Sequence, residues 1–325
     1  MQTLPKIAIV IVNYKTPELV ADCLASLRDS ADHMDLSVFI GDADSQDGSV
    51  EKIRDTITTQ GLTWAQCFAI GRNGGFAFGN NAVLTRCVLS EPAFTHVYFL
   101  NPDTYIRPDA IAALVAFLDA HPRVGIAGSR LEDPDGSLRS YGFRAPVPWR
   151  EFFRGLRIGA LDKLVPQAAI KIENLMANQQ VDWVTGASFM VHRDILDSIG
   201  LMDDGYFLYF EETDLMTRAR KAGYEVWHVA QSRVVHLAGQ ATGVRTGKDM
   251  PAVQPLSPHW LASRRRYLRK HHGLFGFYRA NMLFLLGDLL YRAHRIIAGR
   301  PIQDPPDLWC NYLGKTSTVA PRHDE

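Results

Sequence analysis

The feature that most constrains this fold is an alternation of short apolar runs and amphipathic segments over the first 130 residues. The apolar runs have the length and composition of strands, whereas the segments between them have helical periodicity. Strands that alternate with helices form βαβ units, so we expect an α/β fold with a Rossmann-like, mostly parallel central sheet flanked by helices. The expected strands are Lys6–Val12, Leu36–Gly41, Leu62–Ile70, His96–Leu100 and Val124–Ala127. The expected helices are Pro17–Leu27, Gly48–Gln60, Gly75–Leu89 and Pro108–Ala120.

The rest of the chain is less regular. Four prolines interrupt the segment from Leu131 to about Val181, which we interpret as a lid or an insertion. Order returns at Val181–His192, and further on we expect a helix at Glu211–Ala222 and strands at Glu225–His228 and Ser232–His236. We divide the chain into a domain of residues 1–243 with halves 1–130 and 131–243, a flexible loop 244–258, a basic and amphipathic helical extension 259–300, and a tail 301–325.

Composition excludes several classes of protein. Lys plus Arg and Asp plus Glu both number 35, so no net charge favours binding to nucleic acid. The four cysteines are scattered without a CxxC pair, a spacing typical of reduced cytosolic thiols rather than of zinc sites or disulfide frameworks. The run Ile7–Val12 is too short for a signal-peptide core, and no run reaches the ~20 apolar residues of a membrane span. We therefore expect a cytoplasmic protein that does not cross a bilayer.

Polar residues follow the expected strands, at the sheet edge where ligands of α/β proteins bind. Asn13 and Tyr14 follow the first strand, and Asp42 and Asp44 the second. An Asp in this position can accept from a ribose hydroxyl or a base N–H, although an Asx turn explains the same residues without a ligand. The third strand leads into RNGGFAFGNN, whose glycines either let backbone N–H groups approach a phosphate or simply form a tight turn.

Carboxylates follow later strands. The fourth strand runs into Asn101-Pro102-Asp103, a spacing that suits a divalent cation chelated by a diphosphate, or an ordinary β-turn. The aromatic run FLYF precedes Glu211, Glu212 and Asp214 and could raise the pKa of a carboxylate towards that of a general base, although acidic residues also favour a helix start. We expect Asp214 to pair with Arg218, one turn away. His236 ends a strand, where a lone His is more often structural than a ligand.

Together these segments resemble the family 2 glycosyltransferases with the GT-A fold, in particular their bacterial rhamnosyltransferase-like branch. The resemblance covers about Ile7 to Gly243 and depends on six motifs in the order of the family rather than on any single motif. The motifs are VIVNYKTPELVADCLASL, GDADSQDGS, RNGGFAFGNN, NPDTYIRPDAI, DWVTGASFMVHRD and GYFLYFEETDLMTRARKAGYEVWHVAQSRVVHLAG. It implies a nucleotide-sugar-binding half, 1–130, and an acceptor and base half, 131–243.

The resemblance implies a role for each matching position. Asp103, with Asn101, occupies the place of the Asp-x-Asp motif and should bind Mg²⁺ or Mn²⁺, and His236 matches a His that completes this metal site. Glu212 matches the catalytic base, although Glu211 or Asp214 could share that role because relatives usually have Asp at this position. The residues expected to contact the nucleotide sugar are Asn13, Tyr14, Asp42, Asp44, Asn73, Gly75, Phe76, Asn80 and Asn101. Those expected near the acceptor or donor sugar are Trp183, Gly186 and Ala187. Relatives commonly have Asp-Asn-x-Ser where this chain has Asp42-Ala43-Asp44-Ser45.

The resemblance implies an inverting transfer of L-rhamnose from dTDP-rhamnose onto a sugar hydroxyl of a glycan, with a polyprenyl-diphosphate-linked acceptor expected. Other UDP-, GDP- or dTDP-linked sugars such as galactofuranose, mannose or N-acetylglucosamine remain alternatives, and a non-enzymatic nucleotide-binding protein is a distant one. In the extension, Arg264–Lys270 is basic and Phe277–Leu290 apolar. This composition suits either a helix on the inner face of the plasma membrane or one packed on the catalytic domain.

Overall fold

The computed structural model describes residues 5–138, 142–158, 164–172, 175–237 and 255–314. These residues form two compact units. The sheet unit consists of residues up to 142 with residues 173–207 and 211–246, and the helical unit of residues 143–172, 208–210 and those from 247 onward. The predicted flexible loop 244–258 lies mostly outside the described residues.

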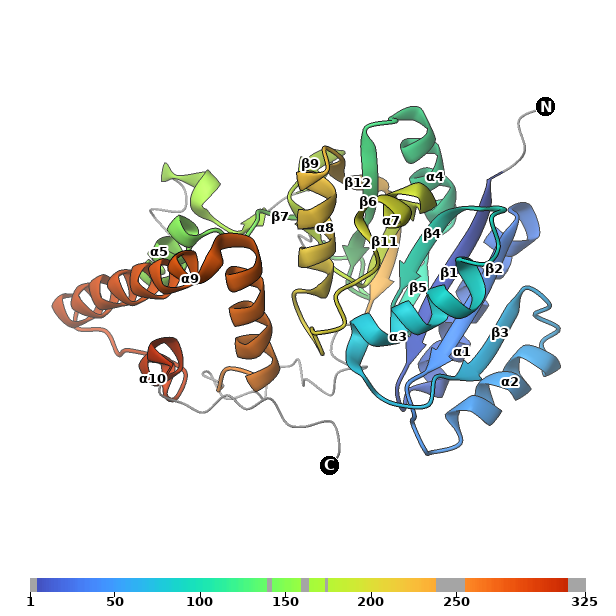
Figure 1. The fold of residues 1–325 in the computed structure, drawn as a ribbon, viewed down its shortest axis with the longest axis horizontal. Coiled ribbons are helices and arrows are strands. Elements are labelled where there is room, and N and C mark those ends of the chain that lie inside the picture. The colour runs from blue at the N-terminus through green and yellow to red at the C-terminus, as the bar shows by residue number, and fades with distance from the viewer. Residues whose placement is uncertain (1–4, 139–141, 159–163, 173–174, 238–254, 315–325) are drawn as a thin grey trace. The chain divides into compact units, whose positions relative to one another are not determined.

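The sheet unit contains a nine-stranded sheet with the strand order β3-β2-β1-β4-β11-β6-β12-β5, to which β9 adds by pairing with β12 (Figure 1). Strands β3, β2, β1 and β4 are parallel to one another, as are β6 and β12. The strands are β1 (Lys6–Asn13), β2 (Leu36–Asp42), β3 (Ala65–Ala69), β4 (Phe94–Leu100), β5 (Thr104–Ile106), β6 (Val124–Glu132), β9 (Gln179–Val181), β11 (Ser188–His192) and β12 (Glu225–His236). The predicted α/β class is confirmed, and all five strands expected in the first 130 residues form.

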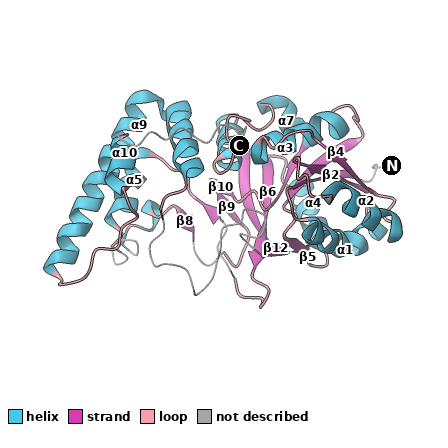
Figure 2. Cartoon of the chain, turned by 90° about the horizontal axis from the view of Figure 1, so that it is seen from below, coloured by secondary structure: helices cyan, strands magenta, loops and turns pink. Residues whose placement is uncertain are grey.

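Helices cover both faces of this sheet (Figure 2). Helices α1 (Pro17–His33), α2 (Ser49–Thr59) and α4 (Ala110–Ala120) pack on one face. Helices α3 (Gly75–Val83), α7 (Arg193–Ile199) and α8 (Glu211–Lys221) pack on the other. The expected helix Gly75–Leu89 ends as α-helix at Val83 and continues as the π-helical turn Leu84–Val88.

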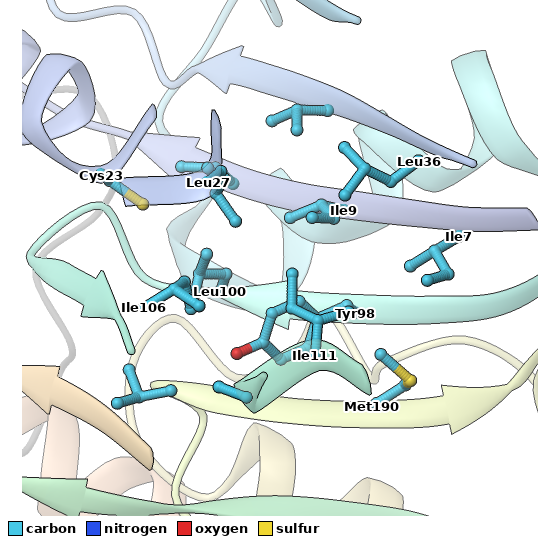
Figure 3. Packing of buried hydrophobic residues seen from close by; sticks show 14 of the residues in the cluster. Ile7, Ile9, Cys23, Leu27, Leu36, Tyr98, Leu100, Ile106, Ile111 and Met190 are labelled. Carbon is cyan, nitrogen blue, oxygen red and sulfur yellow. The ribbon is translucent and has the colours of Figure 1, made fainter. Parts of the chain in front are cut away.

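The main core lies between the sheet and the first helical face, where alternate strand residues meet the apolar stripes of the helices. Figure 3 shows Ile7 and Ile9 of β1 beside Leu27 of α1, with Tyr98 of β4 and Ile111 of α4 in the same cluster. All five side chains are fully buried. This packing fixes the register of β1 and β4 and so positions the residues that follow these strands.

Two strand features differ from the sequence-based expectation. Strand β11 lies between β4 and β6 and is antiparallel to both, although the sequence gives no sign of a reversed strand in the centre of the sheet. The two expected strands Glu225–His228 and Ser232–His236 are one strand, β12, because a register shift between Val229 and Arg233 accommodates the intervening residues.

The helical unit contains α5 (Pro148–Leu156), the long helix α9 (Pro258–Ile297) and α10 (Leu308–Leu313). The predicted helical extension is therefore confirmed, with a kink at Gly273, whose φ of 69° is not helical. Helices α5 and α9 touch through their backbones: a Cβ at Gly155 would lie 2.2 Å from the carbonyl oxygen of Phe284, and one at Gly287 would lie 2.1 Å from that of Phe152. No helix of the described ranges is long and apolar enough to cross a membrane.

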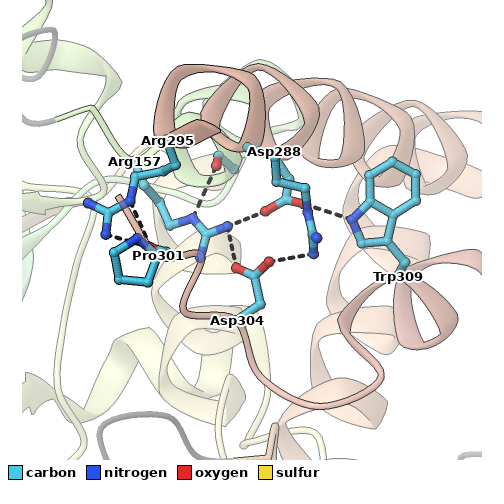
Figure 4. A network of polar contacts seen from close by, with 8 residues as sticks. Arg157, Asp288, Arg295, Pro301, Asp304 and Trp309 are labelled. Atoms are coloured by element: carbon cyan, nitrogen blue, oxygen red, sulfur yellow. Dashed lines mark hydrogen bonds and ion pairs between the residues drawn. The ribbon is translucent and has the colours of Figure 1, made fainter. Parts of the chain in front are cut away.

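Partly buried ion pairs join the end of α5 to α9 and to the segment after it (Figure 4). Arg157 pairs with Asp288 and, at 2.8 Å, with Asp304. The carboxylate of Asp288 also accepts from Arg292 and from the indole N–H of Trp309, both at 2.7 Å. Because Asp288 is fully buried, these donors replace the water that its charge loses on folding.

The remaining short strands are β7 (Gly142–Phe143), β8 (Lys171–Ile172) and β10 (Trp183–Val184). A 3₁₀ turn, Pro166–Ala168, precedes β8. The segment from 143 to 172 thus belongs to the helical unit rather than to the sheet.

Candidate active site

Predicted site residues from four strands leave the sheet at the same edge. Strands β1, β2, β4 and β12 run in one direction, so Asn13, Asp42, Asn101 and His236 all lie at or just after the carboxyl ends of these strands. Strand β11 runs the other way and begins at this edge with Ser188. The chain thus brings one amide, carboxylate or imidazole from each of these four strands to a single edge.

Asn13, Asp42 and Ser45 form a closed hydrogen-bonded corner between β1 and β2. The amide of Asn13 donates to Asp42 Oδ2 at 2.6 Å, the hydroxyl of Ser45 donates to the same oxygen at 2.7 Å, and the Ser45 backbone N–H donates to Oδ1 at 2.9 Å. Ser45 Oγ in turn accepts from the backbone N–H of Lys15 at 2.8 Å. Both carboxylate oxygens of Asp42 therefore hold the loops in place.

Two further predicted nucleotide-binding residues lie beside this corner and are more open. Tyr14 is 37% exposed, and the Lys15 ammonium group lies 5.1 Å from the centre of its ring. Asp44 is partly exposed and has a left-handed backbone conformation, with φ of 59°. Their side chains, unlike that of Asp42, are accessible to a ligand.

The glycine-rich loop is shaped by close backbone contact. A Cβ on Gly75 would lie 2.0 Å from the carbonyl oxygen of Phe207, and Gly75 has φ of 86°, so only glycine fits. The same carbonyl accepts from the N–H of Phe76 at 2.9 Å. Asn73 accepts from the Gly75 N–H at 3.1 Å, and Asn80 donates to the Phe76 carbonyl at 2.8 Å. Asn73 and Asn80 thus hold the loop and the first turn of α3.

Asp103 and His236 come together although they lie far apart in the sequence. His236 Nε2 is 3.3 Å from Asp103 Oδ1, and the Leu237 N–H donates to the Asp103 carbonyl at 3.0 Å. Among the described residues, Asn101 Oδ1, Asp103 Oδ1 and His236 Nδ1 are buried atoms without a hydrogen-bond partner. Buried polar atoms are rarely left unpaired, so the two oxygens fit an ion, with His236 Nε2 as the nitrogen beside Asp103 Oδ1.

This donor set suits Mg²⁺ or Mn²⁺. It offers an amide oxygen, a carboxylate and an imidazole, and within the described residues no further His, Cys, Asp or Glu joins them closely enough to complete a metal site. Magnesium is commonly held by one or two protein oxygens, with substrate phosphates and water filling the remaining positions. The residues thus fit an ion that binds together with a diphosphate.

Glu211 and Glu212 begin α8 and carry strongly shifted acidities. Burial, then the neighbouring charge of Glu212, raises the pKa of Glu211 well above its ordinary value. Burial raises the pKa of Glu212 to about 7, although hydrogen bonds from backbone N–H groups oppose the rise. One oxygen of each carboxyl, Oε2, is buried and without a hydrogen-bond partner. A carboxyl that titrates near pH 7 is suited to general-base chemistry.

Asp214 is placed differently from the two glutamates. It is fully buried, accepts from Arg218 Nε at 2.9 Å and from the Tyr206 hydroxyl at 3.4 Å, and the expected pair with Arg218 is confirmed. Arg218 also donates to the carbonyls of Ile199, Gly200 and Leu201. Asp214 therefore anchors α8 to the segment before it.

Gly186 links the glycine-rich loop to the glutamate pair. A Cβ at Gly186 would lie 3.3 Å from the Phe76 ring and 3.9 Å from Cβ of Glu212. The next residue, Ala187, is buried in the main core and accepts at its carbonyl from the Asn101 N–H at 2.9 Å. The chain thus brings Phe76, Gly186 and Glu212 together, and Ala187 contributes through its backbone.

Trp183 lies in β10, three residues before Gly186, and is partly buried. The roles expected for it and for the other site residues stay predictions.

The sequence analysis missed two residues that shape the site. The Ser45 hydroxyl holds the loop after β2, and the Phe207 carbonyl holds the glycine-rich loop. It also missed the turn before Glu211, where Tyr209 and Phe210 both have φ of 70°. The only sign of that turn was the aromatic run FLYF, which does not report backbone conformation.

Comparison with known proteins agrees with this geometry. Residues 5–247 match the family model described as glycosyltransferase like family 2. N-acetylglucosaminyl-diphospho-decaprenol L-rhamnosyltransferase of Mycobacterium tuberculosis is 27% identical over 301 residues, which cover 89% of this chain and 92% of the relative. Rhamnosyltransferase WbbL of Escherichia coli K12 is 24% identical over 169 residues, which cover 51% of this chain and 62% of the relative.

Among solved structures, a mannosyltransferase from Pyrobaculum calidifontis in complex with GDP-Man and Mn²⁺ superposes with a TM-score of 0.56 at 15% identity. The superposition covers 92% of this chain and 76% of that chain. The predicted GT-A fold and the resemblance to rhamnosyltransferases are thereby confirmed. Since the family model spans well over half of the sequence, the chain belongs to glycosyltransferase family 2.

Proposed function

We propose that this protein transfers L-rhamnose from dTDP-rhamnose to a hydroxyl of a sugar carried on a polyprenyl diphosphate. Two relatives are rhamnosyltransferases, which supports the sugar, and the mycobacterial relative acts on N-acetylglucosaminyl-diphospho-decaprenol, which supports the acceptor class. The observation that carries the proposal is the set of unpaired buried oxygens on Asn101, Asp103, Glu211 and Glu212. These oxygens supply the two functions that a glycosyl transfer needs, a diphosphate anchor and a base.

Glu212 is the proposed base. As a whole residue Glu212 is only partly buried, and its Cβ lies beside Gly186, whereas Glu211 is buried and Asp214 is held by Arg218. Two adjacent carboxyls with unequal pKa values take different roles. The one with the higher pKa stays protonated, and the other is ionised and can accept a proton from the substrate. Glu212 would take the proton of the acceptor hydroxyl as its oxygen attacks the anomeric carbon from the face opposite the diphosphate. A single displacement of this kind inverts the anomeric configuration.

Asn101, Asp103 and His236 would hold Mg²⁺ or Mn²⁺ on the donor diphosphate. When bound, such an ion neutralises the charge that grows on the departing nucleoside diphosphate. Tyr14 and Asp44 are the accessible side chains for the nucleoside. Asn13 and Asp42 would support nucleotide binding indirectly, because their hydrogen bonds hold the loop that carries the accessible side chains.

The second arm of α9, after the kink, supports an acceptor in a membrane. Exposed apolar side chains on one face of this arm form a stripe, composed of Phe275, Tyr278, Met282, Leu286, Leu289, Leu290 and Ile297. The opposite face of the same helix is buried within the helical unit through Ala280, Phe284 and Gly287. Exposed basic residues accompany the stripe, including Arg279 on this arm and Lys270 just before the kink. An apolar stripe with basic neighbours suits the surface of an anionic leaflet, so we place the protein at the inner face of the plasma membrane.

The proposal is tested by release of nucleoside diphosphate from each of dTDP-rhamnose and a set of UDP- and GDP-sugars, with Mn²⁺ and N-acetylglucosaminyl-diphospho-polyprenol. Release from dTDP-rhamnose alone is the expected result, with inverted linkage in the product. Glu212→Gln and Asp103→Asn should each lower the rate by about 10²–10⁴-fold. Glu51→Gln, an exposed carboxylate on α2, is the matched control and should leave the rate unchanged. Release from another donor only would refute the rhamnosyl assignment, and full activity of Glu212→Gln would refute the base.

A further inference from the structure

A second cluster of polar side chains lies at the opposite end of the sheet from the candidate active site. It consists of His96 near the start of β4, His192 at the end of β11 and Asp119 near the end of α4. The strand register pairs His96 with His192, and their rings lie 4.6 Å apart. One ligand atom from each of the three side chains lies within 4.8 Å of the other two.

The Thr95 hydroxyl holds one ring nitrogen of His96. It lies 2.9 Å from His96 Nδ1 and 3.2 Å from the carbonyl of Lys6. This contact leaves Nε2 as the ring nitrogen available to a ligand.

The other ring nitrogen of His96 lies near a carboxylate. Nε2 of His96 is buried without a hydrogen-bond partner and lies 3.4 Å from Oδ1 of Asp119. Buried polar atoms are rarely left unpaired, so Nε2 fits a cation shared with this carboxylate.

We propose that His96, His192 and Asp119 bind a divalent transition-metal ion, with Zn²⁺ preferred and water completing the coordination. Two neutral imidazoles and one carboxylate are a common ligand set for zinc, whereas a site in which nitrogen ligands outnumber oxygen ligands is unfavourable for Mg²⁺. The Thr95 hydroxyl lies 2.9 Å from Nδ1 of His96, and the second nitrogen of a metal-bound His usually has such a partner. Asp119 is 52% exposed, so an ion can reach the site from solvent.

The ion would be structural rather than catalytic. It would join β4 and α4 to β11, which comes much later in the sequence. The site is separate from the one proposed at Asp103, which follows the other end of β4. An ion that binds only the folded chain stabilises it by mass action.

The test uses the full chain without a histidine tag, treated with a chelator and then titrated with Zn²⁺ by calorimetry. We expect about one Zn²⁺ per chain, a rise in the melting temperature, and visible absorption typical of tetrahedral coordination when Co²⁺ replaces zinc. Asp119→Asn and His192→Gln should each weaken zinc binding by at least ~10-fold. The matched control is His121→Gln, which removes an exposed imidazole two residues from Asp119 but outside the cluster and should bind zinc as the wild type does.

Zinc binding unchanged in both cluster variants, or lost in His121→Gln, would overturn the proposal, as would absence of one-to-one binding by the wild type. Circular dichroism of each variant shows whether it is folded. Asp119→Asn alters a half-exposed side chain and decides the question if His192→Gln does not fold. Asp103→Asn should keep the zinc site, so the outcome is independent of the proposed transferase activity.

Discussion

Replacement of Glu212 by Gln should stabilise the protein at alkaline pH while it removes the proposed activity. Burial raises the pKa of this carboxyl from 4.5 to about 7. Between these two values the unfolded chain loses the proton while the folded chain keeps it, so the wild type loses stability as the pH rises. Each pH unit in this window corresponds to about 1.4 kcal/mol. The full penalty is therefore about 3 kcal/mol above pH 7, and only about 1 kcal/mol near pH 5.

The assay is urea unfolding of the wild type and of Glu212→Gln at about pH 5 and about pH 8, with EDTA to exclude metal effects. Gln is neutral at both pH values, so the variant should gain about 1 kcal/mol at the lower pH and about 3 kcal/mol at the higher. Glu51→Gln removes an exposed carboxylate and should change stability little at either pH. A gain independent of pH, or a loss at about pH 8, would refute a desolvated carboxyl at this position.

Three further outcomes follow from the structure. Gly75→Ala should lower the free energy of unfolding by about 2–4 kcal/mol, because the added methyl group would meet a carbonyl oxygen. Gly61 also has a positive φ but open space around it, so Gly61→Ala should lower the free energy of unfolding by only about 1 kcal/mol. Urea unfolding of the two variants makes the comparison. The transfer rate should rise with pH and be half-maximal near pH 7 as Glu212 loses its proton, and a rate that is constant down to about pH 5 would exclude this base. The side chains of Phe275 and Ile297 are 79% and 88% exposed. The double variant Phe275→Asp, Ile297→Asp should weaken co-sedimentation with anionic vesicles at least ~10-fold. Unchanged binding would exclude the stripe as the surface that contacts the membrane.

The strands that could be predicted are those whose apolar runs are bounded by turn residues. Lys6–Asn13 is nearly continuous Ile, Val and Ala because it is buried on both faces of the sheet, and this pattern is typical of a central parallel strand. Ser188–His192 is equally central, but it is short and its apolar residues do not reveal in which direction it runs. Thr104–Ile106 is a three-residue strand whose pairing with β12 depends on tertiary position alone.

The site was predictable as a set of residues but not as a geometry. Asp103 and His236 were identified by resemblance, and their contact depends on β12 lying parallel to the strand before Asp103, which no local pattern specifies. The motif containing Asp42 suggested a ligand contact, whereas the oxygens of Asp42 bind Asn13 and Ser45. Residues His96 and His192 have no sequence signature because β11 alone brings them together.

The central position of β11 also has a consequence for synthesis of the chain. Strands β4 and β6 are complete once residue 132 has been made, but the strand that joins them begins only at residue 188. Until β11 leaves the ribosome, the nascent chain has two hydrophobic strands with unpaired edges, the kind of edge at which chains associate. A fragment that ends at residue 130 keeps this gap permanently and should aggregate rather than fold as a nucleotide-binding half. The smallest fragment able to close the sheet between β4 and β6 must extend through His192.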